Sequence, residues 1–233
     1  MLDLRILGSS SHGNCYLLYA GSEVLLLECG IQAKKIIYGL NFRVDNVVGA
    51  LCSHEHGDHS KSVKDVMKAG IDVYASEGTF SALGVEGHRV KKLKALEQVQ
   101  IGGFTVLPFD VQHDAREPLG FLIQHEAIGK LLFATDTYYI KYKFPELNYI
   151  MVECNYSKSI LEKNIQAGTL SKALRNRLLK SHFSLENVKE FLKANDLKKV
   201  ENILLMHLSD GNSNAGEFQE EIEKLTGIPV KIC

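Results

Sequence analysis

Short apolar runs separated by Gly, Ser and Asn fill the chain before residue 157, and their lengths predict β-strands. Val47–Cys52 is apolar throughout, which predicts a strand buried on both faces. Residues 15–19 and 24–27 flank Gly21-Ser22, and this arrangement predicts a hairpin. The remaining runs of strand length are Leu2–Leu7, Asp72–Tyr74, Val99–Ile101, Phe104–Phe109, Phe121–Gln124 and Leu131–Thr135.

After residue 157 the pattern changes to Leu, Lys and Glu at helical spacing. This spacing predicts helices over Ser157–Lys180, Ser184–Asn195 and Glu217–Leu225. Two strands, Ile203–Met206 and Val230–Ile232, alternate with them. Strand-rich blocks that each end in helices predict an α+β fold in which helices cover β-sheets.

The composition fits one large domain over residues 1–233, because 45% of the residues are hydrophobic and can form a substantial core. The net charge of −1 gives no overall basic field for nucleic acid, although it does not exclude a local basic patch. Five widely spaced cysteines without a CxxC pair favour reduced thiols in the cytoplasm. No signal-peptide core or membrane-length apolar stretch occurs, so we expect a cytoplasmic protein with no membrane partner.

The stretch SHEHGDHS concentrates potential metal ligands directly after the predicted buried strand. His54 and His56 are two residues apart, so in an extended backbone both point the same way and can converge on one ion. Asp58 and His59 follow a glycine and can turn toward a second point. A solvated polar loop is the alternative interpretation. If the loop does bind metal, it supplies two ligands to each of two sites, and the remaining ligands must come from other strand ends.

HEHGDH resembles the HxHxDH motif of the metallo-β-lactamase superfamily, and later segments resemble that superfamily's other motifs in the same order. VQHDAREPLGF supplies His113, LLFATDT supplies Asp136 and ILLMHLSD supplies His207. The resemblance spans nearly the whole chain. It implies an αββα sandwich, in which two mixed β-sheets pack together and are flanked by helices.

The resemblance also implies a centre of two divalent metal ions with seven ligands. His54, His56 and His113 would hold one ion, Asp58, His59 and His207 the other, and Asp136 would bridge them. Asp58 or Asp136 would orient the bridging water. Zn²⁺ and Mn²⁺ both fit, since histidine and aspartate ligands without cysteine do not choose between them.

One residue departs from the superfamily pattern. Where the family has Asp at the end of an early strand, in a pattern like LIDCG, this chain has Glu28 in LLLECG. The family carboxylate supports the ligand loop without binding metal, and the longer glutamate can still accept hydrogen bonds there. The departure leaves open whether Glu28 orients the loop.

Three further segments resemble a bacterial nuclease group of the WalJ (YycJ) type, which acts on single-stranded DNA from the 5′ end. They are GSSSHGNCYLL, VECNYSKSILEKNIQAGTLSKALRNRLLKSHFS and HLSDGNSNAGE. Ser181 and Leu185 replace the group's usual Gly and Asn, and one Asn is displaced among Asn212 and Asn214. The chain therefore resembles a divergent member of that group.

His182 is the residue that the nuclease branch adds. In related phosphodiesterases and nucleases a histidine at this place contacts phosphate or protonates the leaving alkoxide, a step that suits the pKa of histidine. A surface histidine that caps the following helix is the alternative. Five residues are candidates for substrate binding: Ser10, Asn14, Asn155, Arg175 and Arg177. The alternatives are a loop that packs beneath the site for the first two and a solvated helix face for the arginines.

The hypothesis from the sequence is a dinuclear metal-dependent phosphodiesterase, a nuclease whose partner is a nucleic acid substrate, single-stranded DNA. The runner-up is a thioester or small cyclic or linear phosphodiester hydrolase on the same centre. A metal-stabilised binding module without catalysis is the third alternative. The sequence does not decide between DNA and RNA, and it does not give the cleavage polarity, the physiological metal or the oligomeric state.

Overall fold

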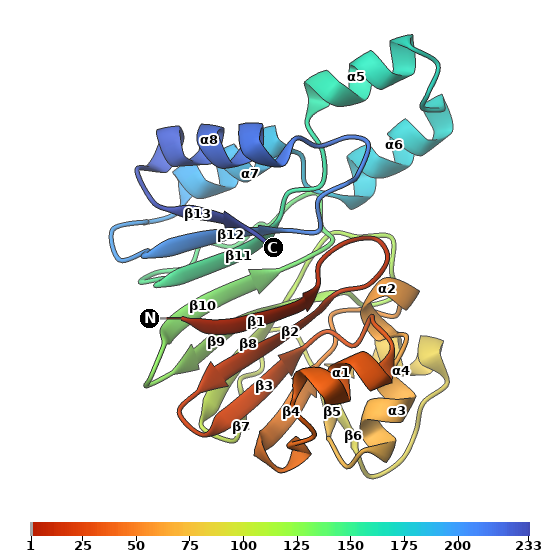
Figure 1. The fold of residues 1–233 in the computed structure, drawn as a ribbon, viewed down its shortest axis with the longest axis vertical. Coiled ribbons are helices and arrows are strands. Elements are labelled where there is room, and N and C mark those ends of the chain that lie inside the picture. Colours follow the sequence, from red (N-terminus) through yellow and green to blue (C-terminus); the bar gives the residue numbers. More distant parts are fainter. Residues whose placement is uncertain (1) are drawn as a thin grey trace. The chain divides into compact units, whose positions relative to one another are not determined.

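A computed structural model describes residues 2–233. The described chain has the predicted α+β architecture, with two mixed β-sheets flanked by helices (Figure 1). It divides into two compact units. The first contains the described residues up to Asp110 together with Ala115–Gly129, and the second contains Val111–Asp114 and Lys130–Cys233. The single domain expected from the composition stays a prediction.

The first unit contains a mixed sheet with its strands in sequence order. These strands are β1 (Asp3–Gly8), β2 (Cys15–Ala20), β3 (Glu23–Leu27), β4 (Val47–Leu51), β5 (Val73–Ser76) and β6 (Val90–Leu93). The first three are antiparallel, and β3 to β6 are parallel. The predicted hairpin is confirmed as β2–β3, with Gly21 at a φ of 62° in its turn.

Helices of the first unit cover one face of this sheet. The helical segments are α1 (Ala33–Gly39), η1 (Val44–Asn46), α2 (Gly57–Ser60), α3 (Val63–Lys68) and α4 (Glu77–Leu83). Ile36, Val66 and Phe80, one from each of α1, α3 and α4, pack into a core with alternate strand residues such as Leu17 and Leu26. The same unit holds the antiparallel strands β7 (Val99–Ile101), β8 (Phe104–Asp110) and β9 (Leu119–His125).

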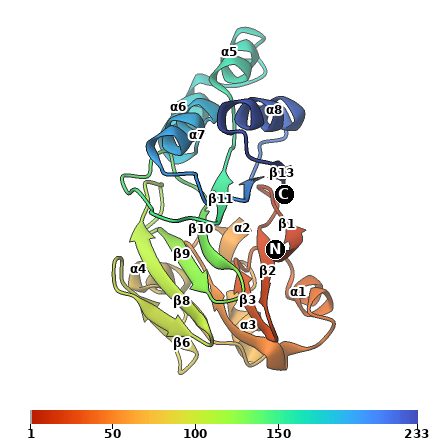
Figure 2. The ribbon, with the colours of Figure 1, turned by 90° about the vertical axis from the view of Figure 1, so that its left-hand side faces the viewer.

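Parallel strands form the centre of the second unit, in the order β10-β11-β12-β13. They are β10 (Gly129–Ala134), β11 (Tyr149–Glu153), β12 (Asn202–Met206) and β13 (Val230–Ile232). Helix α7 (Leu185–Ala194) packs beside α8 (Ala215–Thr226), and α8 lies against β13 (Figure 2). No helix within residues 2–233 combines the length and the apolar character that a membrane span requires.

The helix predicted over Ser157–Lys180 is wrong as one continuous element. The structure has two helices there, α5 (Lys158–Gln166) and α6 (Lys172–Ser181). Gly168 lies in the connection between these helices and has a φ of 73°, which glycine adopts without strain. The Ser171 hydroxyl then accepts a hydrogen bond from the Leu174 N–H and caps the start of α6.

Candidate metal centre

In the first unit, the loop after β4 brings its histidine and aspartate side chains together. The His54 ring lies edge-on to His56 with centroids 4.7 Å apart, and it lies 4.3 Å from His59. Asp58 and His59 fall within the single turn of α2, where Oδ2 of Asp58 is 3.4 Å from Nε2 of His59. His54 and His59 are almost fully buried. These four side chains therefore form one compact donor group.

Backbone and side-chain contacts within the first unit hold this loop in place. The Ser53 hydroxyl lies 2.9 Å from Nδ1 of His54, which fixes the orientation of that ring. Asn14 donates its backbone N–H to the Asp58 carbonyl at 2.7 Å. Gly30 backs directly onto the loop, since a Cβ there would stand 1.6 Å from the same carbonyl oxygen. Only glycine fits at that position.

Glu28, the departure from the superfamily pattern, reaches the same loop. Its carboxylate is fully buried, and both oxygens lie 3.3 Å from the Ser53 N–H, which donates to them. One of these oxygens is also 3.6 Å from Nδ1 of His59. Glu28 has a φ of 65°, a left-handed backbone conformation that turns the chain sharply after β3. The longer side chain thus still contacts the ligand loop.

The second unit gathers its candidate ligands at the carboxyl ends of parallel strands. Asp136 follows β10 and His207 follows β12, and Oδ1 of Asp136 lies 3.2 Å from Nδ1 of His207. Oδ2 of Asp136 is 3.6 Å from Nε2 of His113. His113 donates from Nδ1 to the Ser181 carbonyl at 2.7 Å. Burial lowers the pKa of His113 and favours the neutral imidazole that binds metal.

Glu153, at the end of β11, is the site residue that sequence reasoning missed. Its carboxylate is fully buried and accepts backbone N–H bonds from Phe183 at 3.0 Å and Thr137 at 3.1 Å. Its other oxygen lies 2.6 Å from Nδ1 of His182 and 3.0 Å from Nδ1 of His207. The sequence signal was the acidic residue that ends the apolar run YIMVE, which forms β11 and is absent from the predicted strands.

Opposite charge decides the protonation of the Glu153–His182 pair. Burial alone would raise the pKa of Glu153, but His182 and the hydrogen bonds from His182 and His207 bring it below its ordinary value. Burial alone would likewise lower the pKa of His182, but the charge and hydrogen bond of Glu153 raise it above its ordinary value. Both shifts favour the ion pair, a carboxylate with an imidazolium, over the neutral pair.

His182 stands within the donor group of the second unit. Asp136, Glu153, His182 and His207 each offer a ligand atom within 4.8 Å of the others. The His182 ring stacks on His207 with centroids 5.7 Å apart. His182 keeps 13% of its side chain exposed, more than Asp136, Glu153 and His207. It therefore remains accessible from solvent while its partners are enclosed.

A comparison with protein families shows the family to which the chain belongs. The family described as "Beta-lactamase superfamily domain" matches residues 29–208, which is more than half of the chain. The chain belongs to the metallo-β-lactamase superfamily. This membership confirms the resemblance and the fold expected from the HEHGDH motif and its companions. Together with the His/Asp groups in each unit, it supports a metal-dependent hydrolase.

Two relatives are similar to this chain over most of its length. Exodeoxyribonuclease WalJ of Streptococcus pneumoniae is 28% identical over 225 residues, covering 89% of this chain and 82% of that protein. Exodeoxyribonuclease YycJ of Bacillus anthracis is 28% identical over 229 residues, covering 91% and 84%. Both support the resemblance to the WalJ-type group.

Solved structures share the metallo-β-lactamase fold at low sequence identity. The metallo-β-lactamase fold protein YhfI from Bacillus subtilis has a TM-score of 0.76 at 14% identity and covers 100% of this chain and 97% of its own. Human tRNase Z, short form, has a TM-score of 0.63 at 14% identity and covers 99% and 95%. These two likenesses show the fold alone.

The candidate substrate-binding residues of this superfamily member differ in the hydrogen bonds that they make within the protein. Asn14 is buried and directs its amide at the Ser10 carbonyl, 3.1 Å away, and at the Asp58 carbonyl, 3.3 Å away. Asn155 donates to the His207 carbonyl at 2.9 Å. Arg175 pairs with a glutamate and Arg177 with an aspartate, each through hydrogen bonds. Their roles toward a substrate stay predictions.

Proposed function

We propose that the protein is a dinuclear metal-dependent phosphodiesterase, a nuclease that degrades single-stranded DNA from the 5′ end. The observation that carries this proposal is the similarity of about nine tenths of the chain to two exodeoxyribonucleases of the same superfamily. The histidine that the nuclease branch adds, His182, lies within the donor group of the second unit and supports the same proposal.

Seven residues would hold the two ions in this proposal, four from the first unit and three from the second. They are His54, His56, Asp58, His59, His113, Asp136 and His207. The donor chemistry fits, because imidazole and carboxylate ligands suit Zn²⁺ and Mn²⁺. The buried thiols are not needed, since burial raises the pKa of Cys52 and keeps it protonated. Bound ions would lower the pKa of a water molecule and stabilise the charge that develops on the phosphate.

The protein's own groups would divide the remaining work. Asp58 would orient the attacking water, and His182 would give a proton to the leaving oxygen. Since Nδ1 of His182 is committed to Glu153 at 2.6 Å, Nε2 is the nitrogen left to meet the substrate. Glu153 would keep the ring protonated and fix its orientation, as carboxylate partners of catalytic histidines do.

A digest of end-labelled nucleic acids tests the proposal. Full-length protein loaded with Mn²⁺ or Zn²⁺ is incubated with 5′- and 3′-labelled single- and double-stranded DNA and with RNA, and Asp58→Ala serves as the control. We expect mononucleotide release from the 5′ end of single-stranded DNA and none from the variant. Cleavage of a small thioester without any cleavage of DNA would instead favour the hydrolase alternative. DNA binding without turnover would favour the binding module.

Metal content tests the dinuclear part separately. Elemental analysis of the purified chain is expected to give about two transition-metal ions per molecule, as in two-metal hydrolases. Asp136→Ala is expected to lose both ions, because this residue would bridge them. A wild-type protein that binds less than about one ion would rule out the dinuclear centre.

A further inference from the structure

The segment that follows Asp136 combines aromatic and basic residues in a way that the proposed mechanism does not use. It reads YYIKYK over residues 138–143. The described chain has no helix or strand between the end of β10 at Ala134 and the start of β11 at Tyr149. Irregular segments of this length inside a compact unit are usually functional, and binding residues are often placed on them.

This segment forms one wall of a cavity in the second unit, with a volume of about 420 Å³. The opposite wall comes from Phe183 and from α7, including Phe191. Ile140, Phe183 and Phe191 are buried at its base, whereas Tyr139 keeps 55% of its surface exposed. We call this cavity the aromatic slot. Its size falls within the range of small-molecule sites and accommodates a nucleobase with its sugar.

The aromatic slot is joined covalently to the donor group of the second unit at both walls. Tyr138 is two residues beyond Asp136, and Phe183 directly follows His182. The Thr137 hydroxyl donates to the Tyr139 carbonyl at 2.8 Å and fixes the start of the segment. The lining of the slot therefore includes chain neighbours of two residues of the donor group.

The charges around the aromatic slot suit a polyanion. Lys141 and Lys143 belong to the same segment, and Nζ of Lys141 lies 5.0 Å from the centre of the Tyr142 ring. Glu190 is the acid in the lining, and Lys193 offsets its charge at 2.8 Å. Aromatic faces beside lysines are the usual means of binding single-stranded nucleic acid, because bases stack and phosphates pair with cations.

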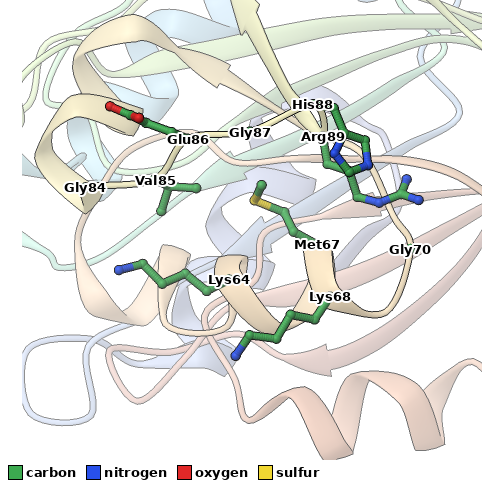
Figure 3. Close-up of a pocket in the computed structure, with 10 residues that line it drawn as sticks. All are labelled: Lys64, Met67, Lys68, Gly70, Gly84, Val85, Glu86, Gly87, His88 and Arg89. Atoms are coloured by element: carbon green, nitrogen blue, oxygen red, sulfur yellow. The ribbon is translucent and has the colours of Figure 1, made fainter.

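A cavity of the first unit provides a contrast. It has a volume of about 570 Å³ and lies between α3 and the segment 84–89 (Figure 3). Lys64 and Lys68 border it, but its lining contains no tyrosine or phenylalanine among the described residues. Arg89 in its wall pairs with Asp72 at 2.9 Å. This cavity has cations and the imidazole of His88 but no phenol or phenyl ring among its lining residues, so the tyrosine and phenylalanine rings distinguish the aromatic slot.

We propose that the aromatic slot binds a nucleobase of the single-stranded DNA substrate. The base stacks on Tyr139 and Tyr142, while Lys141 and Lys143 meet the phosphates that flank it. This inference rests on the proposed function and deepens it, since it assigns part of the substrate specificity to residues outside the metal-binding motifs. The aromatic slot also explains a preference for single strands, whose bases are free to leave the stack.

Steady-state kinetics on single-stranded DNA tests the aromatic slot. Tyr139→Ala is expected to raise KM about ten-fold with little change in kcat, the scale of one lost stacked base. Tyr139→Phe keeps the ring and is expected to retain the wild-type KM. Tyr38→Ala, at a site on α1 that is 68% exposed, is the matched control and should change nothing. Lys143→Ala should raise KM more than the control Lys64→Ala.

Two further arms separate this inference from the proposed function. An oligonucleotide with abasic positions should bind more weakly to the wild type, and Tyr139→Ala should no longer discriminate against it. The fluorescence of 2-aminopurine placed in an oligonucleotide is quenched when the base stacks. Measured with protein whose metal has been removed by a chelator, this quenching reports stacking without turnover. DNA cleavage with unchanged KM in Tyr139→Ala and Tyr142→Ala would overturn the aromatic slot and leave the nuclease standing. Quenching without any cleavage would overturn the nuclease and leave the slot.

Discussion

The two units bring their candidate metal ligands together in different ways. In the first unit, four donors come from one loop of six residues after β4, so their proximity is largely a property of the local sequence. In the second unit, Asp136, Glu153 and His207 each follow or end a different parallel strand, and His182 follows α6. Their proximity exists only once the sheet has formed. The first group can be recognised as a motif, whereas the second depends on tertiary structure.

The largest effect is expected at His182, because this residue of the second unit's donor group would carry out the chemistry. His182→Ala should lower kcat on single-stranded DNA by about 10²–10⁴-fold, the usual contribution of a general acid. Metal content should remain at the wild-type level, because His182 is not among the seven proposed ligands. Elemental analysis and kinetics on the same preparation measure both. Loss of metal together with activity would instead make His182 a ligand, as its place in the donor group of the second unit permits.

A smaller effect is expected at the residue that positions two histidines. Glu153→Gln preserves the shape of the side chain but removes the charge next to His182 and His207. We expect about a 10–100-fold loss in kcat or metal affinity, as for other carboxylates that orient ligands. The alkaline limb of the pH–rate profile should also move toward lower pH, because His182 must be protonated to act as the acid and loses the carboxylate that raises its pKa. A purely structural role would leave that limb where it is.

This comparison also explains how much of the molecule the sequence could predict. The β-hairpin, the buried strand Val47–Leu51 and the HEHGDH loop have strong local patterns. Helix α1 was missed because it contains a glycine and its N-cap, Gln32, provides no side-chain hydrogen bond, so packing of Ile36 stabilises it. Glu153 was missed because an acid at a strand end is ordinarily solvated. Only the fold shows that it is fully buried against two histidines.

The pH dependence of stability tests the Glu153–His182 pair in protein whose metal has been removed by a chelator. The pKa of Glu153 is lowered, so its contribution is present above about pH 4.3 and is lost as the pH falls through the folded value. The pKa of His182 is raised, so its contribution is complete below about pH 6.5 and is lost as the pH rises through the folded value. Wild-type Tm relative to Glu153→Gln should therefore differ most between these limits. A difference that does not vary with pH would contradict the ion pair.

The smallest effect is expected at Glu28, the matching buried carboxylate of the first unit. Glu28→Asp restores the residue of the superfamily pattern, and aspartate tolerates the φ of 65° at this position. The shorter side chain withdraws from the Ser53 N–H, which now lies 3.3 Å from both oxygens. We expect kcat/KM to fall by less than about ten-fold, with unchanged metal content. This loss is smaller than the loss of about 10–100-fold that is usual when a carboxylate bonded directly to a metal-binding side chain is removed.

Glu28 and Glu153 differ in what they contact, and this difference makes the Glu28 variant informative. Glu28 holds the backbone of a loop that Asn14 and Gly30 already restrain, whereas Glu153 bonds directly to two imidazoles. Shortening Glu28 therefore removes one of several restraints, and the remaining ones keep the donors together. Both variants are compared by kcat/KM and by metal titration. If Glu28→Asp lost as much kcat/KM as Glu153→Gln, the loop after β4 would depend on its buried carboxylate as strongly as the donor group of the second unit does.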